Sequence, residues 1–226
     1  MERFDLVVIG AGPSGYAAAM RAVDFKKKIL LIEKSELGGA GVTNGALSSK
    51  TWWELSREAS AFRKSLKRYN IKAPHVNYKE IQNEVAKAVG ERKSMLEEHI
   101  DMLKNSNYSS LLQFKSGNAR LLTPNTIEIT VGAKTEIVWA ENIILATGSR
   151  PRYLPELPID EKIVMTSDGI ERMEDFPESM VIVGAGVIGC EFATIFSGFG
   201  RTKVHLIDKG DRILPFEDED VVHIIE

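Results

Sequence analysis

Two clusters of glycines in this chain have the spacing of a nucleotide-binding turn. They are the first fingerprint, Gly10, Gly12 and Gly15, and the second fingerprint, Gly184, Gly186 and Gly189. In this spacing the first glycine permits a tight turn, the second lets backbone approach a diphosphate, and the third lets a helix pack against a strand. The diphosphate lies at the amino end of that helix, where N–H groups and the helix dipole favour an anion. Two fingerprints therefore predict two nucleotide sites.

An acid follows each fingerprint at the end of a second apolar strand pattern. KKILLIEK places Glu33 and TKVHLIDK places Asp208 about twenty residues after the first glycine, where a carboxylate accepts hydrogen bonds from ribose hydroxyls. Glycine turns without a nucleotide would not explain an acid at both strand ends. At the second site Asp208 would repel a 2′-phosphate, which favours NAD. Four nearby cations leave NADP open, namely Arg201, Lys203, Lys209 and Arg212.

The elements expected to carry these residues have an α/β order. We predict strands over 4–9, 28–33 and 180–183, helices over 12–25, 47–69 and 78–105, and a short helix over 167–173. LLQFKSG, TIEITVG and EIVWA predict a meander of short antiparallel strands, and ENIILATGSRP predicts a buried strand. The helix over 78–105 has one apolar stripe, which predicts core packing, formed by Ile81, Val85, Val89, Leu96, Ile100 and Leu103.

This order predicts two Rossmann-like modules of the three-layer ββα type, with a long helical excursion and a small antiparallel meander. Pro151, Pro155 and Pro158 indicate a connection between domains. We therefore expect a first nucleotide-binding domain over 1–150 and the start of a second over 151–226. The second module is expected to be incomplete, because only its opening strand, helix and strand precede an acidic stretch over 217–220 and the start of a helix.

Composition excludes several classes of protein. With 226 residues, 43% of them apolar and 27% charged, the chain is typical of a globular protein. A net charge of −3 with a pI near 5.9 gives no basic footprint for nucleic acid, and no apolar run is long enough for a membrane span. A strand begins directly after Met1, so we expect no signal peptide and a cytoplasmic location.

The sulfur and histidine content argues against other kinds of site. Cys190 is the only cysteine, so an intrachain disulfide is excluded, and we expect this thiol to pack as a small apolar group. The histidines have no ligand spacing, so we expect no metal site; they are His75, His99, His205 and His223.

The order of motifs resembles one family of flavoproteins. VVIGAGPSGYAAA with IEK, the GG…G…SK stretch, ATGSRP and GAGVIGCEFATIF are similar, in this order, to the pyridine nucleotide-disulfide oxidoreductases. The resemblance covers essentially the whole chain. Dihydrolipoamide dehydrogenase is similar throughout, and GVIGCEFATIFSGFG with TSDGI resembles the soluble pyridine nucleotide transhydrogenase branch in particular. The resemblance implies FAD at the first fingerprint, NAD or NADP at the second, and hydride transfer between them in a homodimer.

The resemblance also implies site residues. Lys50 paired with Glu191 would lie at the flavin edge and take the catalytic role. The expected FAD contacts are Gly10, Ala11, Gly12, Pro13, Ser14, Gly15, Glu33, Lys34, Gly39, Ala40, Thr43, Gly45, Ala46, Lys50, Ala119, Ala146, Thr147 and Gly148. The expected NAD contacts are Gly184, Gly186, Val187, Ile188, Gly189 and Asp208. A solvated lysine and a carboxylate stabilised by the helix dipole are the plain alternatives for Lys50 and Glu191.

One segment departs from the family pattern. Members that reduce disulfides read GGTCLNVGCIPSK where this chain reads GGAGVTNGALSSK, so Gly41 and Ala46 occupy the two cysteine positions. Neither residue can carry electrons. We therefore expect an FAD-dependent NAD(P)H oxidoreductase of transhydrogenase or diaphorase type that works without a redox disulfide. The alternatives are a dihydrolipoamide dehydrogenase by descent and an inactive relic or scaffold. We expect the chain to be a fragment that is incomplete as a catalyst.

Overall fold

The computed structural model describes residues 1–225, and the chain divides into two compact units. Unit 1 comprises Met1–Leu47 and Ala88–Arg150, and unit 2 comprises Ser48–Lys87 and Pro151–Glu226. Residues 48–87 of the helical excursion thus group with the second unit by their contacts. The expected domain boundary between residues 150 and 151 stays a prediction. Each unit is described by itself below.

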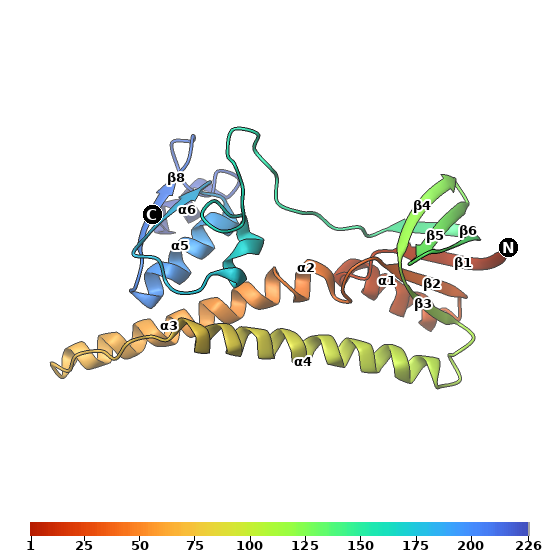
Figure 1. The fold of residues 1–226 in the computed structure, drawn as a ribbon, viewed down its shortest axis with the longest axis horizontal. Helices are drawn as coiled ribbons and strands as arrows, with labels where there is room; N and C mark the ends of the chain where they lie inside the picture. The colour runs from red at the N-terminus through yellow and green to blue at the C-terminus, as the bar shows by residue number, and fades with distance from the viewer. Residues whose placement is uncertain (226) are drawn as a thin grey trace. The chain divides into compact units, whose positions relative to one another are not determined.

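Unit 1 is built on a six-stranded sheet with the order β3-β2-β1-β6-β5-β4 (Figure 1). The first four strands in this order, β3, β2, β1 and β6, run parallel to one another. β5 pairs antiparallel with β6, and β4 pairs antiparallel with β5. The bounds are β1 Glu2–Ile9, β2 Ile29–Glu33, β3 Leu112–Ser116, β4 Asn118–Thr123, β5 Thr126–Val131 and β6 Lys134–Leu145. The α/β class with parallel strands is confirmed.

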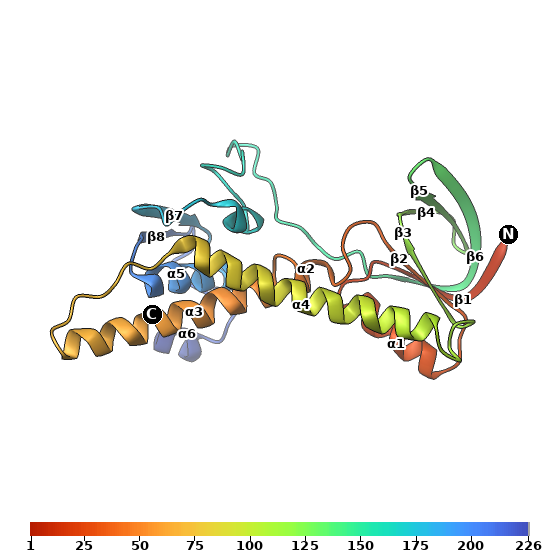
Figure 2. The same ribbon diagram turned by 60° about the horizontal axis from the view of Figure 1, so that its bottom comes forward.

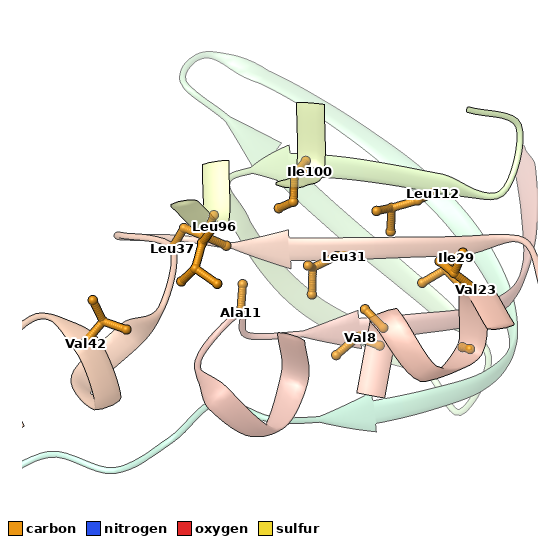
Figure 3. Close-up of a cluster of buried hydrophobic side chains, with 12 residues drawn as sticks. Val8, Ala11, Val23, Ile29, Leu31, Leu37, Val42, Leu96, Ile100 and Leu112 are labelled. Atoms are coloured by element: carbon orange, nitrogen blue, oxygen red, sulfur yellow. The ribbon is translucent and has the colours of Figure 1, made fainter. Parts of the chain in front are cut away.

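Both faces of this sheet are covered, as the ββα arrangement requires. On one face the sheet packs against α1 (Pro13–Asp24) and the second part of α4 (Tyr78–Lys104), and Figure 3 shows the buried side chains of that layer. On the other face Phe4, Val7 and Leu30 meet Ile127 and Ile129 of the meander. The stripe predicted on α4 is confirmed, since all six of its apolar residues are buried or half-buried against a core.

Unit 1 differs from the predicted elements in four details. LLQFKSG does not join the antiparallel meander, because β3 pairs in parallel with β2. Strand β4 was not predicted, since its residues are mostly exposed and lack an alternating pattern. EIVWA and ENIIL form one strand, β6, and its last residues are largely exposed rather than buried, because β5 flanks β6 only as far as Trp139. The glycine-rich stretch contains a short helix, α2 (Gly39–Val42).

Unit 2 contains the second strand–helix–strand pattern. β7 (Ser179–Val183) pairs in parallel with β8 (Lys203–Ile207), and α5 (Val187–Phe199) connects them (Figure 2). The unit also holds most of α3 (Ala46–Arg68), the first part of α4, the 3₁₀ helix η1 (Ser167–Arg172) and α6 (Glu219–Ile225). The predicted short helix over 167–173 is therefore a 3₁₀ turn.

Aromatic packing forms the core of unit 2. Trp52 is fully buried and contacts the rings of Tyr78, Phe196 and Phe199. Gly198 lets α5 approach α3, because a Cβ there would lie 2.8 Å from the Ser56 hydroxyl oxygen. The packing of α3 on α5 is what brings Lys50 near Glu191.

Within residues 1–225, no helix combines the length and apolar character that crossing a bilayer demands.

Candidate functional site

The first fingerprint has the geometry that its glycines predict. Gly10 has φ +103°, and a Cβ there would lie 2.1 Å from the Ala146 carbonyl oxygen. A Cβ on Gly15 would lie 1.9 Å from the Gly10 carbonyl oxygen, so only glycine lets α1 pack this closely. At Gly12, by contrast, the nearest atom to such a Cβ is 4.0 Å away, at the Gly38 carbonyl. The middle glycine therefore leaves open space beside the loop, as the approach of a diphosphate would require.

The second fingerprint repeats this division of roles. Gly184 has φ +109°, and a Cβ on Gly189 would lie 1.8 Å from the Gly184 carbonyl oxygen. A Cβ on Gly186 would meet no described atom within 4 Å. Val187 and Ile188, at the start of α5, are 61% and 60% exposed. The amino end of α5 is thus exposed, and its expected contact with NAD stays a prediction.

Both predicted acids hold their own fingerprint loop. The buried Glu33 carboxylate accepts a hydrogen bond of 2.7 Å from Ala11 N–H and one of 2.8 Å from Ser35 N–H. Asp208 accepts equivalent bonds of 2.7 Å from Ala185 N–H and from Gly210 N–H. These backbone donors hold the pKa of Asp208 below its ordinary value. Each acid therefore fixes the loop beside which a ribose would lie.

The segment after β2 packs against the first fingerprint. Gly38 N–H donates to the Ala11 carbonyl at 2.9 Å, and a Cβ on Gly39 would lie 3.1 Å from Gly12 Cα. The Ala146 N–H donates to the Ile9 carbonyl oxygen at 2.8 Å. This bond places the ATGS segment, residues 146–149, beside Gly10. Several expected contacts therefore lie together in unit 1. The cofactor-binding role of the other expected contacts in this region stays a prediction: Pro13, Ser14, Lys34, Ala40, Thr43, Gly45, Thr147 and Gly148.

Ala119 lies outside this group of contacts. It sits in β4, pairs with Ile129 across the sheet, and packs half-buried against the meander side of the core. Its expected approach to an adenine stays a prediction.

The two positions of the missing cysteines differ in their surroundings. A Cβ on Gly41 would lie 2.3 Å from Pro13 Cγ, so the loop has no room for a side chain there unless it shifts. Ala46 is exposed at the start of α3. The loop is therefore packed around glycine at position 41. Residues 38–50 contain no cysteine.

Lys50 and Glu191 form an ion pair within unit 2. Lys50 Nζ donates to Glu191 Oε1, and the two side chains are 64% and 17% exposed. The same oxygen accepts a second bond from Ser49 Oγ at 3.2 Å. The pairing of Lys50 with Glu191 agrees with what the resemblance implies. Ser49 was missed, because an isolated serine beside a lysine carries no signal of its own in the sequence.

A cavity of about 390 Å³ adjoins this pair. Its wall is formed by Lys50, Trp53, Val187, Cys190, Glu191, Thr194 and Leu214. The Cys190 thiol lies 3.3 Å from the Ala185 carbonyl oxygen, and burial raises the pKa of Cys190. A raised pKa keeps the thiol neutral and unreactive. Cys190 lines a cavity rather than filling the core as expected.

Comparison with known proteins shows where this arrangement belongs. Residues 4–226 match the family model described as pyridine nucleotide-disulphide oxidoreductase. The chain belongs to this family. Its members include a soluble pyridine nucleotide transhydrogenase of Mycobacterium bovis, 33% identical over 100% of this chain and 48% of the relative. A dihydrolipoyl dehydrogenase of Bacillus subtilis is 34% identical over 96% of this chain and 46% of its own length.

A solved structure of the same fold supports the architecture. The crystal structure of LpdA from Mycobacterium tuberculosis superposes with a TM-score of 0.83 at 24% identity, covering 100% of this chain and 49% of that one. The chain thus spans about half the length of the family relatives that it matches.

Among residues 1–225, no group of three His, Cys, Asp or Glu side chains is placed to hold a metal.

Proposed function

We propose that the full-length protein is an FAD-dependent NAD(P)H oxidoreductase of transhydrogenase or diaphorase type. Its hydride transfer would run through flavin without a redox disulfide in the segment after β2. The observation that carries this proposal is the Lys50–Glu191 pair, which is intact while Gly41 and Ala46 stand at the two cysteine positions. An oxidoreductase family that uses pyridine nucleotides supplies the context.

The residues present fit both cofactors. In unit 1, the open face of Gly12 and the N–H groups at the start of α1 would bind the FAD diphosphate, with Glu33 on the ribose. In unit 2, Gly186 and the start of α5 would bind the diphosphate of NAD, with Asp208 on its ribose. Asp208 disfavours a 2′-phosphate, which supports NAD over NADP.

The charge pair suits a reaction in which charge develops beside it. FAD supplies the hydride chemistry when bound, and the protein supplies binding, orientation and electrostatics. The Lys50 ammonium would stabilise negative charge at the cofactor edge, and Glu191 would hold that ammonium in place. The pKa of the Cys190 thiol is raised by burial, which disfavours the thiolate form.

Dihydrolipoamide dehydrogenase is the second candidate function. The Bacillus subtilis relative with that name, 34% identical, favours it by descent. The reaction on a dithiol needs a sulfur pair, however, and Gly41 and Ala46 do not supply one. An inactive scaffold, in which the fold would serve binding without catalysis, is disfavoured, because an unused catalytic site has no need of the intact Lys50–Glu191 pair.

The test uses purified full-length protein and three electron acceptors. We expect a yellow protein that oxidises NADH with thio-NAD or a quinone, and that turns over lipoamide at less than about 1% of that rate. Lys50→Met should lower the rate about tenfold or more, whereas the control Lys64→Met, an exposed lysine on the same helix, should not. A colourless protein that ignores added FAD would contradict the proposal, and fast lipoamide turnover would support the second candidate.

A further inference from the structure

Ser49 is a buried serine that directs its hydroxyl out of its own helix. Only 8% of the residue is exposed, and Oγ lies 3.2 Å from Glu191 Oε1 on α5. Lys50, the next residue, donates to the same carboxylate oxygen. Two neighbouring residues of α3 therefore converge on one acceptor atom.

A serine inside a helix usually bonds to a carbonyl of the preceding turn. Ser56 does so, since its Oγ donates to the Trp53 carbonyl at 3.0 Å within α3. Ser49 instead uses its hydroxyl to join α3 to α5. Both serines are buried on the same helix, so burial alone does not explain the difference.

The two donors to Glu191 differ in how firmly they hold it. Lys50 is 64% exposed on a long flexible side chain, and exposed ion pairs constrain geometry weakly. Ser49 has a short side chain with one heavy-atom torsion in a buried setting, so its donor has few alternative positions. Its bond to Glu191 is long, at 3.2 Å against about 2.5–3.0 Å for an ordinary O–H···O bond, and it acts together with the Lys50 contact by restricting the orientation of Oε1.

We infer that Ser49 is a positioning residue for the Lys50–Glu191 pair, and this inference rests on the proposed function. Its hydroxyl restricts the orientation of the Glu191 carboxylate that pairs with Lys50 within unit 2, and on the proposed function this pair would act on the flavin. The hydroxyl contributes no proton and touches no substrate. Its loss should slow reduction of the flavin by letting the pair adopt other geometries.

The experiment measures the rate constant of flavin bleaching by NADH in the full-length protein loaded with FAD. Ser49→Ala should lower it about fivefold or more, because one of two donors to a charged group is lost. Ser56→Ala is the matched control, which removes a buried hydroxyl from the same helix and should change the rate less than about twofold. Ser49→Thr should restore the rate, and its isostere Ser49→Val should not, so a loss of packing is separated from a loss of the hydroxyl.

A double-mutant cycle completes the test. In a Glu191→Gln background, Ser49→Ala should have less than about a twofold further effect, since the carboxylate that it positions is gone. Equal effects of Ser49→Ala and Ser56→Ala, or full additivity with Glu191→Gln, would overturn the inference alone. Failure of NADH to bleach the wild-type flavin would overturn the proposed function, and the inference with it.

Discussion

Glu33 and Asp208 are equivalent residues that each hold two backbone N–H groups. A carboxylate has about four lone-pair sites, so each acid can bind its loop and still accept from a ribose. The bonds from the backbone to each acid fix the fingerprint loop beside which a nucleotide would bind.

The Asp208 bonds predict a pH-dependent stability. Its folded pKa lies below the ordinary value, because Ala185 and Gly210 donate to it. Its stabilising effect is therefore present above the unfolded pKa of about 3.9 and is lost as pH falls through the lower folded value. Asp208→Asn should lower the urea midpoint of the full-length protein at pH 7, and by less at pH 3. Asp211→Asn, an exposed site in the same loop, is the control. An equal loss at both pH values would contradict this reading.

Glu33 predicts a larger cost, because its carboxylate is buried. Glu33→Ala leaves the N–H groups of Ala11 and Ser35 without their acceptor and should lower the free energy of unfolding by about 1–3 kcal/mol. Glu33→Gln, which keeps one acceptor oxygen, should cost less. Urea unfolding of the three proteins measures both effects, and equal losses in the two variants would refute the role of the bonds.

The sequence predicts the glycines and acids at the residue scale, because their spacing reflects a shared chemical need. It does not predict Ser49, whose partner Glu191 is distant in the chain, or the backbone donors to Glu33 and Asp208. These contacts depend on how α3 packs against α5 and on the conformation of each fingerprint loop. Neither the packing nor the loop conformation is marked by a residue pattern in the sequence.

At the scale of elements, the outer glycines and the middle glycine of each fingerprint have separable roles. A Cβ at Gly189 would meet the Gly184 carbonyl at 1.8 Å, whereas one at Gly186 would enter open space. Gly189→Ala should therefore destabilise unit 2 by about 3 kcal/mol or more, since α5 must move away from β7. Gly186→Ala should keep the stability within about 1 kcal/mol and weaken NADH binding.

Thermal unfolding and NADH titration of the two variants distinguish these roles. The same pair of changes in unit 1, Gly15→Ala and Gly12→Ala, provides an independent repeat with FAD as the ligand. A Gly186→Ala variant that bound NADH normally would show that no diphosphate approaches this glycine.

Helices and strands with a clear hydrophobic period or a short apolar run were predicted from the sequence. The strands that depend on hydrogen-bonded pairing with distant residues were not. α4 follows its apolar stripe, and β1, β2, β7 and β8 follow short apolar runs. β3 was misread, because a five-residue strand has no local feature that separates parallel from antiparallel pairing. β4 was missed, since ladder bonds to β5 rather than burial hold it.

At the scale of the whole molecule, the stretch after β6 connects the two units without a helix or strand before η1. Arg152 and Lys162 are exposed within it. Limited trypsin digestion of the full-length protein should therefore cut first after one of these residues, because segments without regular structure are preferred sites of proteolysis. A first cut within α3 or α4 would contradict this, and mass spectrometry of the early fragments decides.

This chain spans about half the length of the family relatives that it matches. The homodimer that the resemblance implies and the cytoplasmic location expected from the sequence both stay predictions. The sequence order of motifs predicts the family correctly, because the two fingerprints and the segments around them extend over the whole chain. The grouping of residues 48–87 with unit 2 was not predictable, since it depends on aromatic contacts between distant helices.

The most direct test of a cysteine-free site is an anaerobic titration of the FAD-loaded, full-length protein with NADH. Without a sulfur pair to store electrons, the flavin absorbance should fall from the first addition and reach its end at about one NADH per FAD. An initial equivalent of NADH consumed without bleaching, or an end point near two equivalents, would show a second electron store and contradict the account.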